Sequence, residues 1–307
     1  MNILVIGGNG FIGSHFVDVI VAGGASVRVL DRPGSLRREG KLSVDYLYGD
    51  FSVVATLADA LTGSDVVVHF ASTTVPGTAD LDPIADIESN LVPTVRLLQQ
   101  MRALNVRRLI YLSSGGTVYG NTRMVPIPEE QERNPLSSYG IVKVAIENYI
   151  RAFAVQTGVE ALILRPSNPY GPRQGHIGVQ GVIPTFFQRI LKCEPIQIWG
   201  DGNNVRDYIY IDDVVRFIAL ALERGLIGVF NLGSGQGSSV KDVLKIISEV
   251  TGITAEVRYL PARGYDVRSV ILDITKARSA LPWVPLVSLR DGCERYWRWL
   301  TEQQVKS

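Results

Sequence analysis

Short apolar runs alternate with longer segments of helical character along the first half of the chain. Uninterrupted apolar runs that end in turn residues are typical of strands buried on both faces of a parallel sheet. The run at 2–6 is of this kind, and six strands are expected in all, at residues 2–6, 27–30, 44–48, 65–70, 106–112 and 159–164. Helices are expected between them, at 11–22, 52–61, 83–104 and 138–154. This alternation predicts the α/β class, with a Rossmann-type doubly wound parallel sheet.

The alternation loosens after residue 172. Helices are expected at 182–191, 212–223, 239–251 and 288–301, and shorter strands at 197–199, 207–211, 229–232 and 257–260. The helix at 239–251 is expected to be N-capped by Ser238 or Ser239. The predicted domains are 1–172, to which 207–235 returns, and a smaller α/β lobe at the C-terminal side made of 173–206 and 236–307.

The composition of the 307 residues argues against several classes of protein. With 46% hydrophobic and 20% charged residues, the chain has ordinary globular composition. A net charge of +1 leaves no basic excess for nucleic-acid binding, and no run of 18 apolar residues indicates a membrane span. Two distant cysteines and three histidines without ligand spacing indicate no metal site. Together with the absence of a cleavable leader, the cysteines favour a reduced, cytoplasmic location.

A glycine-rich turn separates the first strand from the first helix. Gly7, Gly10 and Gly13 let the chain turn tightly and bring backbone amides close to a pyrophosphate. Asp31 ends the second strand, where a carboxylate accepts hydrogen bonds from the adenosine ribose. Because it would repel a 2′-phosphate, NAD is expected rather than NADP, although the neighbouring Arg32 weakens that preference. The alternative for Asp31 is a solvated turn residue.

Small and polar residues stand at the ends of the third and fourth strands. Asp50 could accept from the adenine amino group and Phe51 could flank the ring, but Asp50 could equally N-cap the following helix. Ala71 and Ser72 are small enough for a cofactor to lie close. His69, within an apolar strand, is expected to be a core histidine.

A tyrosine and a lysine four residues apart begin the helix at 138–154. Tyr139 and Lys143 share one helix face, and a lysine ammonium favours the phenolate form of a nearby tyrosine. Such a phenol can act as a general acid or base. The pair follows a polar strand-end turn at 113–116, and Asn90 is expected to hydrogen-bond at the same site rather than face solvent. A solvated surface pair is the weaker alternative.

Ten segments carry one pattern through nearly the whole chain: GGNGFIG at 7–13, Asp31, GD at 49–50, HFA at 69–71, Asn90, SSGGTVYG at 113–120, YGIVK at 139–143, RPSNPYGPRQ at 165–174, GDGNNVRDYIYIDDVV at 200–215 and PARGYD at 261–266. The pattern resembles the extended short-chain dehydrogenases/reductases that act on nucleotide sugars, and is most similar to UDP-hexose 4-epimerases. The resemblance implies NAD as cofactor, a UDP-sugar as substrate, and a homodimer formed through the helices at 83–104 and 138–154.

The resemblance also implies a role for each matching residue. Tyr139 would be the acid/base, and Lys143 would hold the nicotinamide ribose and lower the pKa of the tyrosine. Asn168 would contact the diphosphate, which Arg206 and Arg263 would clamp, with surface ion pairs as the alternative for both arginines. The cofactor would lie against Gly7, Gly10, Phe11, Ile12, Gly13, Asp31, Arg32, Asp50, Phe51, Phe70, Ala71, Ser72, Asn90, Ser113, Tyr139, Lys143 and Pro166. The substrate would lie against Thr74, Ser114, Gly115, Gly116, Asn168, Arg173, Arg206, Arg263 and Val270.

Two departures from the 4-epimerase pattern, and the absence of one dehydratase feature, bear on the reaction. Gly115 stands where such enzymes carry a Ser or Thr that shares the proton, so Thr117 or Ser114 is expected to take over, unless the tyrosine works alone. Thr74 stands near the place of a common lysine. Gly116 and Thr117 stand where the 4,6-dehydratases of the family carry Asp and Glu, so dehydration is disfavoured.

The expected reaction is inversion of carbon 4 of a UDP-hexose through a 4-keto sugar. Reduction of a nucleotide-linked 4-keto-6-deoxy sugar is the alternative, because it uses the same Tyr–Lys pair. A non-catalytic NAD-binding protein is disfavoured, since a binder needs no base. The resemblance places Val270 beside the carbon 2 substituent, where a small side chain admits an N-acetyl group; the alternative is an ordinary inward-facing strand residue.

Overall fold

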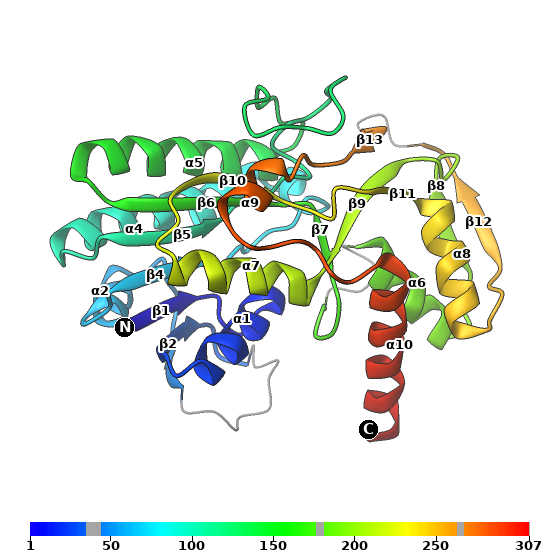
Figure 1. The fold of residues 1–307 in the computed structure, drawn as a ribbon, viewed down its shortest axis with the longest axis horizontal. Helices are drawn as coiled ribbons and strands as arrows, with labels where there is room; N and C mark the ends of the chain where they lie inside the picture. Colours follow the sequence, from blue (N-terminus) through cyan, green and yellow to red (C-terminus); the bar gives the residue numbers. More distant parts are fainter. Residues whose placement is uncertain (35–43, 176–180, 263–266, 307) are drawn as a thin grey trace. The chain divides into compact units, whose positions relative to one another are not determined.

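The computed structural model describes residues 1–34, 44–175, 181–262 and 267–306 (Figure 1). The contacts within the chain divide it into two compact units. Unit 1 consists of residues 1–118, 135–165 and 215–230, and unit 2 of residues 119–134, 166–214 and 231–307. The domain boundaries expected from the sequence stay a prediction.

Unit 1 is built on a seven-stranded sheet with the order β10-β6-β5-β4-β1-β2-β3. The strands are β1 (Asn2–Ile6), β2 (Ser26–Asp31), β3 (Asp45–Tyr48), β4 (Val66–His69), β5 (Arg108–Leu112), β6 (Glu160–Pro166) and β10 (Gly228–Leu232). Parallel pairing runs from β3 through β2, β1, β4 and β5 to β6. This is the strand order of a Rossmann sheet, so the predicted fold class is confirmed.

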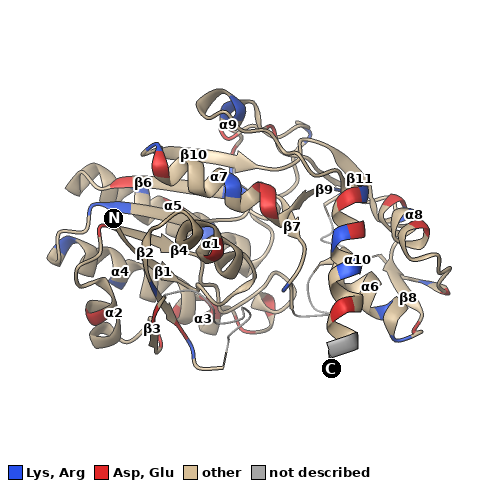
Figure 2. Ribbon diagram, turned by 60° about the horizontal axis from the view of Figure 1, so that its bottom comes forward, with Lys and Arg blue, Asp and Glu red and all other residues tan. Residues whose placement is uncertain are grey.

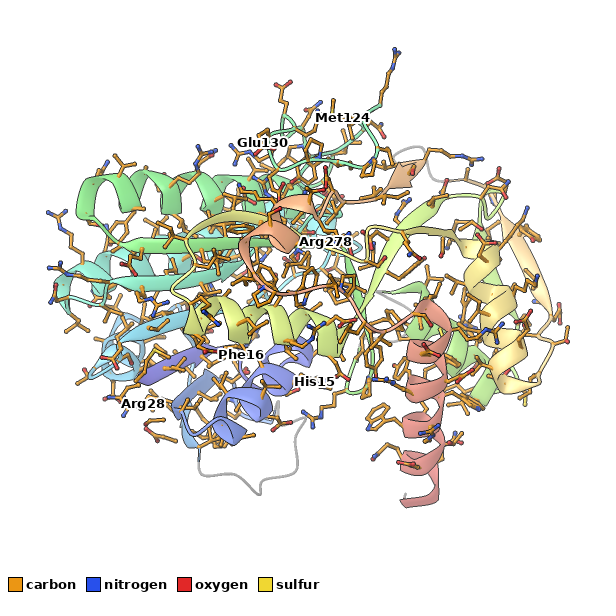
Figure 3. The ribbon with its side chains drawn as sticks, in the orientation of Figure 1. His15, Phe16, Arg28, Met124, Glu130 and Arg278 are labelled. Carbon is orange, nitrogen blue, oxygen red and sulfur yellow. The ribbon has the colours of Figure 1, made fainter. Side chains whose placement is uncertain are left out.

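Helices cover this sheet and fix the loops at its strand ends. They are α1 (Phe11–Ala22), α2 (Val54–Leu61), α3 (Pro83–Asp86), α4 (Val92–Ala103), α5 (Ser138–Thr157) and α7 (Ile211–Glu223), with a 3-10 turn η1 (Ala79–Leu81). Helices α4 and α5 pack side by side (Figure 1). Apolar side chains of α2, α4 and α5 form one buried cluster with those of β1, β4 and β5. On α1, Phe16 packs edge to face against Phe70. Figure 3 labels Phe16 and its neighbour His15 on this helix.

A π-helical turn, η2 (Ile87–Leu91), separates α3 from α4. The single helix predicted at 83–104 is therefore confirmed as one continuous helical segment, with a π turn in its middle that was not predicted. Asn90 lies in this turn and is only 6% exposed, and its amide oxygen accepts from Thr73 N at 2.9 Å. Asn90 is thus turned inward, as expected. Single π turns are frequent at functional sites, and apolar periodicity does not reveal them.

Unit 2 contains two small sheets and a group of helices. Strand β9 (Val205–Tyr210) pairs with β7 (Asn168–Tyr170), β11 (Gly237–Ser239) and β13 (Ser269–Val270), and β8 (Ile196–Trp199) pairs with β12 (Val257–Leu260). The helices are α6 (Val182–Leu191), α8 (Val240–Thr251), α9 (Thr275–Ala280) and α10 (Leu289–Lys306). Ser239 and Asp242 form a capping box on α8, which confirms capping by Ser239. Charges of both signs alternate along α10 (Figure 2).

Across the described ranges, every helix is too short or too polar to span a bilayer.

Candidate active site

The glycine turn after β1 is packed so closely that side chains are excluded. Gly7 has φ +82°, and a Cβ added there would lie 2.7 Å from the amide nitrogen of Ala71. A Cβ on Gly13 would lie 2.1 Å from the carbonyl oxygen of Gly7. The turn therefore rests against the loop after β4 at the point where the strand order reverses, which is where ligands of such sheets bind. Phe11 and Ile12 form the first turn of the helix behind it.

Asp31 is tied to the glycine turn. One carboxylate oxygen accepts from the backbone N–H of Asn9 at 2.8 Å, and the other accepts from that of Arg32 at 2.8 Å. The carboxylate is half-buried, and Arg32 is exposed. A backbone-held carboxylate at the end of β2 fits the predicted ribose partner better than a solvated turn residue; the ribose contact stays a prediction.

Two residues between β3 and α2 are arranged differently from what the sequence suggested. The carboxylate of Asp50 accepts from the backbone N–H of Ser52 at 2.8 Å, and this bond holds its pKa below the usual value. Helix α2 begins after Val53 without a side-chain cap, so the N-cap alternative for Asp50 is wrong. Phe51 is buried and contacts His69 at 5.3 Å between ring centroids, so its ring is used by the core. Its contact with adenine stays a prediction.

His69 is a core residue, as predicted. It is 1% exposed, and its Nε2 lies 3.1 Å from Thr94 Oγ1. Burial, and secondarily the charge of Lys143, lowers the pKa of His69 to about 3. The imidazole is therefore neutral at physiological pH, and it is a weaker base than an ordinary histidine.

Tyr139 and Lys143 project from the first turns of α5, beside the end of β5. Ser137 caps the helix by accepting from Gly140 N at 3.3 Å. The Lys143 Nζ lies 5.5 Å from the centre of the Tyr139 ring and donates to the carbonyl of Leu112 at 3.0 Å. The two side chains share one helix face, and the lysine is anchored to the strand that leads into the polar turn.

The pKa of Tyr139 is shifted in the direction opposite to the one expected from its lysine neighbour. Burial lowers the pKa of Lys143 to about 8. Burial raises the pKa of Tyr139 to about 12; a hydrogen bond with Ser72 opposes this, and the charge of Asp86 adds to it. The expected lowering by Lys143 is therefore wrong for the chain by itself, because the ammonium points to the Leu112 carbonyl and desolvation dominates. At neutral pH, Tyr139 holds its proton.

The polar turn after β5 offers two hydroxyls near the tyrosine. Thr117 Oγ1 is buried and has no hydrogen-bond partner within the described part of the chain. The Thr117 carbonyl lies against α5, because a Cβ added to Gly140 would be 2.9 Å from it. Ser114 is half-buried beside the buried Gly115. Which of Thr117 and Ser114 shares the proton stays a prediction.

A buried ionic network that the sequence did not predict lies beneath this turn. Ser113 Oγ donates to Glu147 at 2.5 Å, and Arg165 forms a bidentate pair with Glu147 at 3.0 and 2.6 Å. The Glu147 side chain is completely buried, and that of Arg165 is 3% exposed. The spacing of Glu147 four residues after Lys143 is the one signal that could have indicated it. Ser113, expected at the cofactor, uses its hydroxyl in this network.

A second missed residue is Asp86, which is completely buried. It accepts from Thr74 Oγ1 at 2.6 Å, from Asn90 Nδ2 at 3.0 Å, and from Ser138 Oγ at 2.8 Å. Thr74, expected to contact substrate, thus directs its hydroxyl to Asp86. The network connects the loop after β4, the π turn and the start of α5.

The predicted diphosphate and sugar contacts fall in unit 2. Asn168 Nδ2 donates to the carbonyl of Asp207 at 2.9 Å, and Arg206 Nη1 donates to the carbonyl of Val205 at 2.9 Å. Val270 is 2% exposed and lies opposite Arg206 in the β13–β9 pair, so these two predicted residues are neighbours. Their contacts with a substrate stay predictions.

The remaining predicted residues are distributed over both units. Arg173 adopts φ +64°, an uncommon conformation for a residue with a side chain. Pro166 is the last residue of β6, and Gly116 lies in the turn after β5. Arg263 lies outside the described residues.

Comparison with known proteins places this geometry in a family. The model of the NAD dependent epimerase/dehydratase family matches residues 3–233. A putative UDP-glucose 4-epimerase of Methanocaldococcus jannaschii is 34% identical over 304 residues, covering 97% of this chain and 98% of the relative. A dTDP-4-dehydro-6-deoxyglucose reductase of Escherichia coli is 32% identical over 305 residues, covering 95% of each.

Solved structures agree with this assignment. The UDP-glucose 4-epimerase of Thermotoga maritima, crystallised with UDP-glucose, superposes with a TM-score of 0.93 at 36% identity, over 99% of this chain and 100% of that one. A UDP-N-acetylglucosamine 4-epimerase of Methanobrevibacter ruminantium, in complex with UDP-N-acetylmuramic acid, gives 0.92 at 28% identity, over 98% of both chains. The matched region includes the glycine turn, the Tyr139–Lys143 pair and β9, and the chain belongs to the NAD dependent epimerase/dehydratase family.

Proposed function

We propose that this enzyme inverts carbon 4 of a UDP-hexose through a transient 4-keto sugar, with NAD as the redox cofactor. The observation that carries the proposal is the position of Tyr139 and Lys143 beside the end of β5, with Lys143 anchored to Leu112. The relatives and neighbours named UDP-glucose 4-epimerases support this reaction over others of the family.

The chain's own residues account for the proton transfers. The bound nicotinamide supplies the acceptor and donor for hydride. Tyr139 exchanges the proton of the sugar's 4-hydroxyl: as the phenolate it receives that proton when the ketone forms, and as the phenol it returns it when the ketone is reduced on the opposite face. Because burial raises the pKa of Tyr139 to about 12 in the chain by itself, the phenol of the return step is the stable form, and the phenolate of the first step would have to be favoured by nearby positive charge once cofactor is bound. The Leu112 carbonyl holds Lys143 in place beside Tyr139.

Unit 2 supplies the residues proposed to hold the UDP group. Asn168 and Arg206 are half-buried and fixed by bonds to backbone carbonyls of β9. We propose that they bind the diphosphate together with Arg263. Binding through the UDP leaves the hexose free to rotate, which inversion at carbon 4 requires.

A second candidate is reduction of a nucleotide-linked 4-keto-6-deoxy sugar. The relative named as a dTDP-4-dehydro-6-deoxyglucose reductase is 32% identical along nearly its whole length. In addition, Gly115 replaces the hydroxyl that 4-epimerases of this type carry. A reductase consumes reduced cofactor in proportion to product, whereas an epimerase consumes none overall.

One experiment separates the two reactions. The purified protein is incubated with UDP-glucose, UDP-N-acetylglucosamine and a nucleotide-linked 4-keto-6-deoxy sugar, each with and without added NADH. Interconversion of the 4-epimers without net NADH oxidation is expected. Stoichiometric NADH oxidation that occurs only with the keto sugar would instead establish the reductase.

We also propose that the protein is a homodimer and works in the cytoplasm. Apolar residues are exposed on both helices of the expected interface: Ile84 (64%) in the α3–α4 segment, and Ile141 (56%), Tyr149 (51%) and Val155 (88%) on α5. A two-fold axis would bury this patch against its own copy. Sedimentation at micromolar concentration should give twice the chain mass, and a monomer mass would refute the dimer.

The cytoplasm is favoured because both cysteines are free thiols.

A further inference from the structure

Two buried carboxylates stand near Lys143, and their surroundings differ. Glu147 faces the guanidinium of Arg165 through two hydrogen bonds, so its charge is neutralised by a full ion pair. Asp86 is equally buried, but its three side-chain donors, from Thr74, Asn90 and Ser138, are all neutral. Among the described residues, Asp86 forms no salt bridge with a lysine or arginine. Its negative charge therefore acts on the ionisable side chains beside it, Tyr139 and Lys143.

Asp86 holds both segments that contact the acid/base tyrosine. Ser138, which donates to Asp86 at 2.8 Å, immediately precedes Tyr139, and its backbone N–H donates to Asp80 at 2.7 Å. Thr74, which donates to Asp86 at 2.6 Å, lies two residues after Ser72, the hydrogen-bond partner of the Tyr139 hydroxyl. The Ser72 hydroxyl itself donates to the Thr74 carbonyl at 3.0 Å. Asp86 thus holds the side chain that precedes the phenol and the loop beside it, while Asp80 holds the Ser138 backbone.

The charges around the Tyr139–Lys143 pair come from every element packed on the first half of α5. Those close to the pair are His69 on β4, Asp80 on η1, Asp86 on α3, Tyr111 on β5, Glu147 on α5 and Arg165 on β6. The charged residues of η2 and α4, Glu88, Arg96 and Arg102, are exposed. His69 is neutral and Glu147 is paired, so Asp86 is the carboxylate that most directly opposes ionisation of the phenol.

We propose that Asp86 is a positioning residue for the acid/base pair, and that its charge, which no salt bridge neutralises among the described residues, sets the pH range in which Tyr139 exchanges its proton. The inference rests on the proposed role of Tyr139. When the phenol ionises, two negative charges, on Tyr139 and Asp86, act on Lys143. Replacing Asp86 by a neutral residue removes one of the two. The phenolate is then favoured at lower pH, and the protonated tyrosine is lost earlier as the pH rises.

The test compares Asp86→Asn with Ser138→Ala in the NAD-loaded enzyme. Asp86→Asn keeps the shape and removes the charge, so the acidic limb of the kcat/KM profile should move down by about one pH unit. Ser138→Ala removes one hydrogen bond and keeps the charge, so kcat should fall about fivefold with the limb unmoved. An Asp86→Asn enzyme with the wild-type limb would overturn the electrostatic role. A Ser138→Ala enzyme with wild-type kcat would overturn the positioning role.

A second readout keeps this inference separate from the proposed reaction. Phenolate absorbance is titrated for each protein against its own Tyr139→Phe counterpart, which isolates the Tyr139 signal without any turnover. The Tyr139 signal should appear at lower pH in Asp86→Asn, and an unchanged titration would refute the proposal. If Asp86→Asn does not fold, Asp86→Ser must give the same shift, because it also removes the charge. A wild-type protein that fails to epimerise UDP-hexoses would refute the proposed function but leave this titration interpretable.

Discussion

Two aspartates among the described residues, one in each unit, are 0% exposed and gather several hydrogen bonds, and their donors differ in kind. Asp86, in unit 1, is bound by three side chains. Asp207, in unit 2, is bound by the backbone N–H groups of Ser234 at 2.7 Å, Gly235 at 3.3 Å and Leu272 at 3.3 Å, and by one hydroxyl.

The difference in donors separates two uses of a buried charge. Backbone donors cannot turn away, so a carboxylate that satisfies them connects chain segments: Asp207 connects β9 to the segments that follow β10 and β13. Side-chain donors can reorient, and the carboxylate that holds them determines where functional groups stand. We therefore expect substitutions around Asp86 and Tyr139 to act on activity, and substitutions at Asp207 to act on stability.

The largest effect on activity is expected from Tyr139→Phe. Removal of the hydroxyl should lower kcat by about 100-fold or more, the scale of general acid–base catalysis, while NAD binding and the thermal midpoint stay near the wild type. Lys143→Ala is the informative companion, because it should weaken NAD binding and lower the rate together. Steady-state rates, NAD titration and thermal unfolding measure the three quantities. A fully active Tyr139→Phe enzyme would remove the tyrosine from the mechanism.

The largest effect on stability is expected from Asp207→Ala. Three backbone N–H groups would lose their acceptor. The site around the Asp207 carboxylate is closely packed, because a Cβ added to Gly233 would lie 2.1 Å from it. We expect a loss of about 3 kcal/mol in the free energy of unfolding, measured by urea denaturation. Asp242→Ala is the matched control, because that aspartate belongs to the exposed capping box of α8 and should cost about 1 kcal/mol. Equal losses at the two positions would contradict the distinction between the aspartates.

The parts predicted from sequence are those with a local signal. The parallel sheet follows from apolar runs, the glycine turn from glycines at most six residues apart, and the pairing of Tyr139 with Lys143 from helical spacing. The Asp86 and Asp207 networks join residues that are distant in sequence: Ser138 is 52 residues from Asp86, and Leu272 is 65 residues from Asp207. No periodicity encodes such a contact, so the sequence could not indicate it.

The pKa of Tyr139 shows the same limit. The spacing correctly placed the lysine beside the tyrosine, but the direction of the pKa shift depends on burial and on where the ammonium points. Lys143 donates to the carbonyl of Leu112, a contact across the helix–strand interface, and the phenol lies in a desolvated site next to Asp86. These are properties of packing, which the order of residues along α5 does not contain.

Val270→Tyr tests whether β13 contributes to substrate selection or only to the scaffold around Asp207. If the small side chain leaves room for an N-acetyl group at carbon 2, the variant should lose about 30-fold in kcat/KM for UDP-N-acetylglucosamine and little for UDP-glucose. Val270→Ala should keep both activities. Because Val270 is 2% exposed, the larger ring will also cost some stability through overpacking. Equal loss of both substrates would make Val270 a scaffold residue.

The smallest effect is expected at Asp31, and it refines the comparison of the two aspartates. Like Asp207, Asp31 accepts hydrogen bonds from backbone N–H groups, those of Asn9 and Arg32. Unlike Asp207, Asp31 is only half-buried, so part of it remains accessible. Backbone donors should therefore position a carboxylate for ligand binding when part of it remains accessible.

We expect NAD to bind about tenfold more tightly than NADP, since the charge would repel a 2′-phosphate. Asp31→Ser should reduce the preference for NAD over NADP. Arg32→Ala should increase that preference about threefold, because it removes a cation that attracts the 2′-phosphate of NADP. Calorimetric titration of both cofactors against the three proteins measures these ratios. Equal affinities in the wild type would mean that Arg32 offsets Asp31, and would favour the reductase as the reaction of this enzyme.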